Sequence, residues 1–159
     1  MTTTIEPLLS EIESLAKAGD WSGALAHVIA YMKADSGTLH VMGADDGQLH
    51  LRAASAGIPP HVVEIVRVVP VGKGMAGLAA ERREPVSICN IQTDTSGDVR
   101  PGARATGVEG AIALPMLLGG DGATTVAGVL GVANRAARTF TAEETEQLLA
   151  IGRALARFV

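Results

Sequence analysis

Residues 68–85 read VVPVGKGMAGLAAERREP, which combines a short apolar run, a glycine-spaced turn and a helix that ends before a proline. Gly72, Gly74 and Gly77 match the spacing G-x-G-x-x-G. That spacing indicates a dinucleotide site only in a parallel β-α-β unit, with an acidic residue about 20 positions later at a strand end. Here the turn lies in mid-chain, and Asp94, at a suitable distance, falls in a polar loop. The context therefore excludes a dinucleotide-binding fold.

The composition is that of one soluble globular domain. The chain has 159 residues, of which 47% are hydrophobic and 19% charged, with a net charge of −4. We expect a single domain over residues 1–159, because this length fills one core. The acidity and the absence of a Lys/Arg cluster disfavour a nucleic-acid partner. No run approaches the ~20 apolar residues of a membrane span, and no signal peptide is evident. We expect a cytoplasmic, bacterial protein without a membrane partner.

Helical patterns occupy both ends of the chain. Residues 1–34 carry two apolar stripes at helical spacing, and Gly19 ends the first helix while Asp20 is a natural N-cap for the second. A T-x-x-E capping box opens a closing helix over residues 141–159.

A sheet is expected over residues 36–134. Asp45-Asp46-Gly47 predicts a hairpin with a three-residue loop in which Gly47 is left-handed. That loop would place His40 opposite Arg52 on a half-exposed strand face. The opposite face would then carry Leu39, Val41, Leu49, Leu51 and Ala53.

Short elements and a second hairpin follow. We expect helices over residues 61–66 and 75–83 and strands over residues 68–71, 86–89, 110–118 and 125–133. The polar residues 90–109 are expected to form a long loop without secondary structure, of the kind that often carries function. The order of elements predicts an α+β fold, an antiparallel sheet with helices on both faces.

In this order, the segments resemble the GAF domain family of small-ligand sensors. The matching pieces are TLHVMGADDGQLHLRAASAG (38–57), VGKGMAGLAAERREPV (71–86), AIALPML (111–117), VAGVLGVANR (126–135) and FTAEETEQLLAIG (140–152). Each piece alone is generic, but the five in this order are specific. The resemblance implies a profilin-like α+β fold. Its terminal helices would pack on one face of a central antiparallel sheet, and short helices with the long loop would roof a small-molecule pocket on the other.

The resemblance and the local chemistry together suggest ligand contacts. The candidates are Thr38, Ser55, Gly74, Met75, Ala76, Asp94, Arg100 and Arg104. Backbone N–H groups at the start of the helix after the glycine turn would meet a polar or anionic ligand; alternatively the glycines only permit tight packing. The loop arginines would bind a small anion; alternatively, the loop is only a solvated lid.

Cyclic-nucleotide-binding members of the family carry an Asn-Lys…Phe…Asp-Glu signature. This chain has a variant of it in Asn134, Arg135, Phe140 and Glu144. We interpret the variant as support for the strand-to-helix junction, with Arg135 paired to an acidic side chain. The long loop also lacks the aromatic residue that stacks on a base, which disfavours a cyclic nucleotide.

Free methionine sulfoxide reductases are the enzymes with this fold. The resemblance places Ala76 where these enzymes have a cysteine. It also places Ala111, Gly131 and Ala133 at about the positions where they have substrate-binding acidic residues. Cys89 is the only cysteine. We expect it to be a buried, inert side chain at a strand end; the alternative is a redox-responsive thiol. No metal or cofactor is expected.

The sequence thus suggests a non-catalytic sensing or regulatory domain of bacterial signal transduction. Ligand binding would order the polar loop and rearrange a homodimer formed by the terminal helices, which would act on an output or kinase protein. The alternatives are a thiol-dependent reductase or redox switch that uses Cys89, and an interaction domain with an occluded pocket.

Overall fold

A six-stranded antiparallel sheet with the strand order β3-β2-β1-β6-β5-β4 forms the middle layer of the fold. The computed structural model describes residues 4–99, 101–119 and 124–159. The strands are β1 (Ser36–Met42), β2 (Leu49–Ala54), β3 (Val68–Val69), β4 (Val86–Ile88), β5 (Gly110–Leu118) and β6 (Thr125–Asn134).

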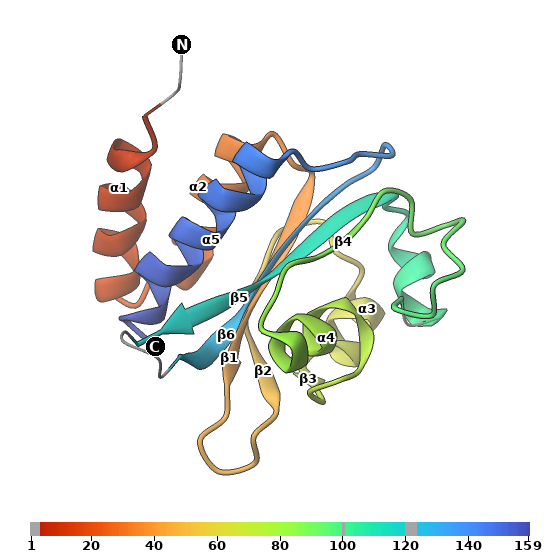
Figure 1. The fold of residues 1–159 in the computed structure, drawn as a ribbon, viewed down its shortest axis with the longest axis horizontal. Helices are drawn as coiled ribbons and strands as arrows, with labels where there is room; N and C mark the ends of the chain where they lie inside the picture. The colour runs from red at the N-terminus through yellow and green to blue at the C-terminus, as the bar shows by residue number, and fades with distance from the viewer. Residues whose placement is uncertain (1–3, 100, 120–123) are drawn as a thin grey trace.

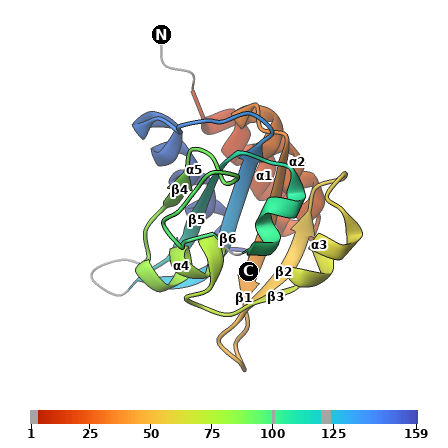
Figure 2. The ribbon, with the colours of Figure 1, turned by 90° about the vertical axis from the view of Figure 1, so that its right-hand side faces the viewer.

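Helices cover both faces of this sheet, as Figure 1 shows. One face carries α1 (Glu6–Lys17), α2 (Trp21–Met32) and α5 (Ala142–Ala156). The other carries α3 (Pro60–Ile65), α4 (Gly74–Arg82) and the 3₁₀ helix η1 (Pro101–Thr106), which face the viewer in Figure 2. The expected α+β architecture, with both terminal helices on one face, is therefore confirmed. Within the described residues, no helix is both long and apolar enough to span a membrane.

The short elements fall where the sequence places them, within one or two residues, with one exception. The segment over residues 90–109 was expected to have no secondary structure, but it contains η1. This turn brings Thr106 and the following Val108 over the sheet, so part of the loop is an ordered piece of the roof.

The described residues form three apolar clusters, of which two contain most of the buried side chains between the layers. The larger lies under α1, α2 and α5, where Leu25, Leu39 and Leu155 are at most 1% exposed. Burial of side chains of this size contributes about 1.5–3 kcal/mol each. The smaller core lies on the opposite face under α4 and includes Leu49 and Val129. The middle of the sheet is therefore buried on both faces.

Side-chain caps fix the starts of two helices. The carboxylate of Asp20 accepts a hydrogen bond from the Gly23 N–H at 2.9 Å. Thr141 Oγ1 accepts from the Glu144 N–H at 3.0 Å, and the Glu144 carboxylate accepts from the Thr141 N–H at 2.9 Å. Both expected caps are confirmed, and caps of this kind contribute about 0.5–2 kcal/mol.

The hairpin of β1 and β2 contains a bulge that the apolar pattern did not indicate. His40 pairs with Leu51 and Leu39 pairs with Ala53, so Arg52 is the extra residue of β2. The expected pairing of His40 with Arg52 is therefore wrong by one residue.

The bulge changes which side chains share a face. Leu49 belongs to the smaller core, whereas Leu39 and Ala53 belong to the larger core. The single apolar face expected for β1 and β2 is therefore wrong, because a one-residue shift reverses the facing of every side chain beyond it. Gly47 has the expected positive φ, 64°, but the loop spans residues 43–48 rather than three residues.

A polar cluster ties β6 to α5. The Asn134 side-chain amide donates to the Lys33 carbonyl at 2.9 Å, and the Arg138 guanidinium donates to the side-chain oxygen of Asn134 at 2.8 Å. Arg138 also pairs with the Glu144 carboxylate and lies 4.2 Å from the ring centre of Phe140. Three residues of the signature variant therefore contact Arg138, and the arginine that pairs with an acidic side chain is Arg138.

The close pairing of β6 with β1 leads to a stability prediction. A Cβ added at Gly128 would overlap the His40 carbonyl oxygen, whereas one at Gly131 would meet only Thr38 Oγ1 at 3.4 Å and the Ile112 carbonyl oxygen at 3.8 Å. We expect Gly128→Ala to lower the free energy of unfolding by about 1–3 kcal/mol, because the strands must move apart. The control Gly131→Ala should leave it unchanged or raise it by up to about 1 kcal/mol. Urea denaturation followed by circular dichroism measures both, and equal effects would contradict the prediction.

Candidate functional site

A cavity of about 220 Å³ lies between the sheet and the segments that cover its second face. The paired ends of β1, β5 and β6 form its floor. Its roof comes from residues 56–59, from Val62 and Val66 at α3, from the first turn of α4, and from Thr106 and Val108. The site lies where the sequence resemblance implied a pocket.

The lining of this cavity is mainly aliphatic. Alanine, valine, isoleucine and methionine side chains predominate, and no aromatic residue is among them. The polar groups inside are the hydroxyls of Ser36, Thr38 and Thr106, and two exposed charged residues, Asp35 and Arg135, also border the space. Such a surface favours a small aliphatic molecule that carries a polar end.

The predicted contact residues are distributed unevenly around this cavity. Thr38, Met75 and Ala76 line it. Gly74 precedes the lining residues of α4, and the Ser55 hydroxyl accepts a hydrogen bond from the Gly37 N–H at 3.0 Å. Arg100 lies outside the described residues.

Two of the loop residues predicted to bind a ligand, Asp94 and Arg104, make their hydrogen bonds within the loop. The Asp94 carboxylate accepts from the Ser96 hydroxyl at 2.7 Å. Arg104 donates to the backbone carbonyls of Ile91 at 3.4 Å and Asp94 at 2.9 Å. Neither Asp94 nor Arg104 lines the cavity, so their predicted role as ligand contacts would require the loop to rearrange.

The glycine turn packs tightly before α4. The Gly72 N–H donates to the Gly77 carbonyl at 2.8 Å, and the Gly77 N–H donates to the Lys73 carbonyl at 3.2 Å. A Cβ at Gly77 would overlap the Pro70 carbonyl oxygen. The glycine at this position is therefore required by packing alone.

The first turn of α4 nevertheless keeps unused donors. In the part of the chain that the structure describes, no side chain caps this helix. Among the described residues, no acceptor pairs with the N–H groups of Gly74, Met75 or Ala76, and the last two residues line the cavity. The packing interpretation therefore holds for Gly77, and the N–H groups of the first turn of α4 are available to a polar atom.

His40 lies at the edge of the site and is buried, at 2% exposure, which corrects the expected half-exposed position. Its Nε2–H donates to the carbonyl of Val66, a roof residue, at 2.8 Å. Its Nδ1 has no hydrogen-bond partner among the described residues. Burial lowers the pKa of His40, because the imidazolium would lose its hydration. The neutral ring therefore connects β1 to the roof.

Asp35 and Arg135 are two charged residues that lie next to each other, although no pattern in the sequence brings them together. The Arg135 N–H donates to the Asp35 carboxylate at 2.7 Å. Among the described residues, neither side chain makes an ion pair. The expectation that the Arg135 side chain pairs with an acid is therefore wrong, since Arg138 makes that pair with Glu144.

Cys89 follows the edge strand β4 and is exposed, so the expectation of a buried side chain is wrong. Its carbonyl accepts a hydrogen bond from the Arg138 N–H at 3.1 Å. The residue is not part of the cavity lining. Across the part of the chain that the structure describes, no three His, Cys, Asp or Glu residues gather in a way that could hold a metal ion.

Comparisons with known proteins agree on the fold. A family model described as GAF domain matches residues 22–159. No curated protein matches the sequence. The GAF domain of a phosphoenolpyruvate-protein phosphotransferase from Acinetobacter is 18% identical, with a TM-score of 0.76 over 99% of this chain and 94% of that one. The corresponding domain from Coxiella burnetii is 19% identical, with a TM-score of 0.75 over 96% and 90%.

A further solved structure is an enzyme. The free methionine-R-sulfoxide reductase from Neisseria meningitidis, in complex with its substrate, is 16% identical, with a TM-score of 0.74 over 99% of this chain and 92% of that one. At these identities the structures show a common fold and do not separate a regulatory domain from an enzyme.

The burial of His40 leads to a pH prediction. Because its folded-state pKa is lowered, the unfolded chain binds the extra proton first, and stability must fall as pH drops below about 6.5. We expect the loss to approach about 1.4 kcal/mol per pH unit until the folded protein also binds the proton. His40→Gln keeps a donor for Val66 but does not titrate, so its stability should depend less on pH.

Urea denaturation between about pH 7.5 and pH 5 measures this difference. His61→Gln, on the exposed surface of α3, is the matched control and should follow the wild type. Parallel curves for the wild type and His40→Gln would contradict the prediction.

Proposed function

The chain belongs to the GAF domain family, and we propose that it is a non-catalytic regulatory domain that binds a small molecule in the cavity between its sheet and roof. The observation that supports this proposal best is the cavity itself, which has a mainly aliphatic lining and two exposed charged residues at its edge. The unused N–H groups at the start of α4 add polar capacity beside it.

The strands beneath the cavity provide a route to the terminal helices. On β1, Thr38 lines the cavity and its neighbour Leu39 lies in the larger core. On β6, Gly131 lines the cavity and its neighbour Leu130 lies in the larger core. A ligand that binds one arrangement of the roof more tightly shifts the population toward it. We propose that this shift reaches α1 and α5, which form a homodimer and act on an output or kinase protein in bacterial signalling.

A thiol-dependent reductase is the second candidate, since similar folds include free methionine-R-sulfoxide reductases. A thiolate that attacks the sulfoxide sulfur leaves a thioether and is itself oxidised to a sulfenic acid, which a second thiol must reduce. Cys89 is the only cysteine of the chain and lies outside the cavity lining. These two facts favour the non-catalytic proposal.

Filling the cavity tests the binding proposal. Gly131→Leu would place an isobutyl group in the cavity from its floor, and Gly131→Ala adds only the Cβ, which the surroundings accept. We expect native mass spectrometry of freshly purified protein to show a bound small molecule with the wild type and Gly131→Ala, and none with Gly131→Leu. A bound molecule in all three proteins, or in none, would contradict the proposal.

An activity assay tests the reductase candidate. We expect the wild type, supplied with free methionine sulfoxide and an external dithiol, to show no more turnover than Cys89→Ser, because the thiol lies outside the cavity. Turnover by the wild type that disappears in Cys89→Ser would instead establish the enzyme.

A further inference from the structure

One hydrogen bond between backbone groups and one from a backbone N–H to a carboxylate place Asp35 and Arg135 side by side at the exposed edge of the cavity. Asp35 precedes β1 and Arg135 follows β6, and these strands pair in antiparallel register. The Asp35 N–H donates to the Ala133 carbonyl at 2.9 Å, while the Arg135 N–H donates to the Asp35 carboxylate at 2.7 Å. The separation of the two residues is therefore set by the sheet and not by a mobile loop.

Both side chains keep most of their hydrogen-bonding capacity. A carboxylate offers about four acceptor sites, of which Asp35 uses one, and a guanidinium offers about five donors. The Arg135 guanidinium donates to no group among the described residues, whereas Arg104 and Arg138 donate to backbone and side-chain oxygens. The exposed edge of the cavity thus has one acidic and one basic group that a bound molecule can contact.

The space behind this pair is apolar and small. Val62, Val66, Ala113 and Val129 are among the apolar residues that line it. A cavity of about 150 Å³ holds benzene, so in proportion the observed 220 Å³ holds about nine non-hydrogen atoms. Leucine, isoleucine and methionine have this size, and a cyclic nucleotide or a tetrapyrrole is far larger.

We propose that the cavity binds a small aliphatic α-amino acid, with its ammonium group on Asp35, its carboxylate on Arg135 and its side chain among the valines. A molecule with only a carboxylate would be repelled by the Asp35 charge, and one with only an amine would be repelled by the Arg135 charge. A zwitterion places an opposite charge against each of the two residues. The first turn of α4 offers donors only and cannot hold the ammonium group. This inference rests on the proposed function, because it names the ligand class of the same cavity.

Isothermal titration calorimetry with three probes that share an isobutyl side chain tests the inference. The probes are L-leucine, its 2-oxo acid and 3-methylbutylamine, with isoleucine, valine and methionine as further amino acids. We expect the wild type to bind leucine at least about tenfold more tightly than the 2-oxo acid or the amine, because each of these loses one charge-assisted contact.

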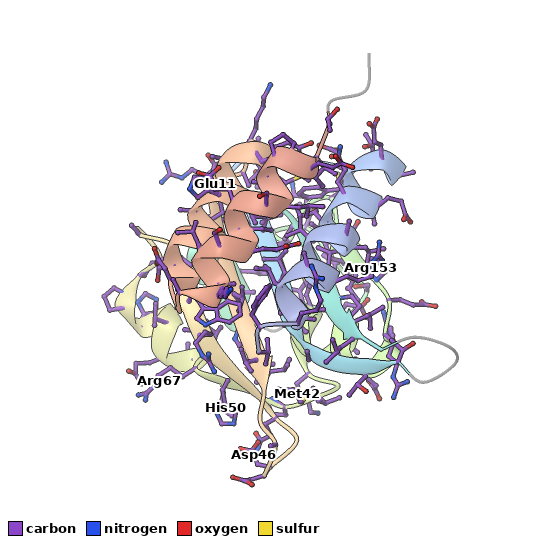
Figure 3. The ribbon with its side chains drawn as sticks, turned by 90° about the vertical axis from the view of Figure 1, so that its left-hand side faces the viewer. Glu11, Met42, Asp46, His50, Arg67 and Arg153 are labelled. Carbon is purple, nitrogen blue, oxygen red and sulfur yellow. The ribbon has the colours of Figure 1, made fainter. Side chains whose placement is uncertain are left out.

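Two variants assign the contacts. Asp35→Asn keeps an acceptor for the Arg135 N–H; it should weaken leucine binding by about tenfold or more without weakening the 2-oxo acid. Arg135→Gln should weaken leucine and the 2-oxo acid but not the amine. The matched controls are Asp45→Asn in the hairpin loop and Arg153→Gln on α5; Figure 3 shows Arg153 on the face of the sheet that carries α1, α2 and α5. Both controls should bind leucine like the wild type.

The outcomes separate this inference from the function on which it rests. Equal affinity for the three probes, or leucine binding that neither variant weakens, would overturn the amino-acid assignment. The assignment would also be overturned if none of the amino acids binds while Gly131→Leu still excludes a different co-purified molecule. That result would leave the proposed function intact. Leucine binding that Gly131→Leu does not weaken would overturn both.

Discussion

The antiparallel pairing of β1 with β6 is the interaction on which the rest of the structure depends. It joins two hairpins whose strands lie some ninety residues apart in the sequence, from Ser36 opposite Ala133 to Val41 opposite Gly128. Contacts between such distant segments form against a large loop-closure entropy. The absence of a side chain at Gly128 allows the backbones to approach. Without this pairing, neither apolar core would be continuous and the cavity would have no floor.

The sequence was informative wherever short-range chemistry decides the structure. The Asp20 and Thr141 caps are interactions over three residues, and both were predictable from residue type and spacing. The bulge at Arg52 was not. Alternation specifies a strand's register when one face is polar, but helices cover both faces of this sheet, so apolar residues are acceptable on either side. Leu49 could therefore enter the smaller core although Leu39 enters the larger.

The sequence predicted the part of the site that follows from the order of its segments along the chain. The resemblance carried Thr38, Met75 and Ala76 to positions that do line the cavity. Charge alone did not predict which loop residues line the cavity. Arg104 donates to backbone carbonyls of the irregular loop, which have no partners in regular secondary structure. The proximity of Asp35 to Arg135 and the burial of His40 both arise from strand pairing over long separations, which no local pattern records.

The position of the charged pair also suggests how occupancy of the cavity reaches the other face of the sheet. Lys33, two residues before Asp35, ends α2 in a left-handed conformation with φ of 53°. Its carbonyl accepts a hydrogen bond from Asn134, the residue before Arg135, and Arg138 bonds both Asn134 and the Glu144 carboxylate of α5. A left-handed non-glycine residue persists only where its surroundings hold it, at a cost of about 1–3 kcal/mol. A ligand that draws Asp35 and Arg135 toward its own charges therefore acts directly on the segment that holds the ends of two helices. In the proposed complex, the same hydrogen bonds that position the binding groups would transmit their displacement to α2 and α5.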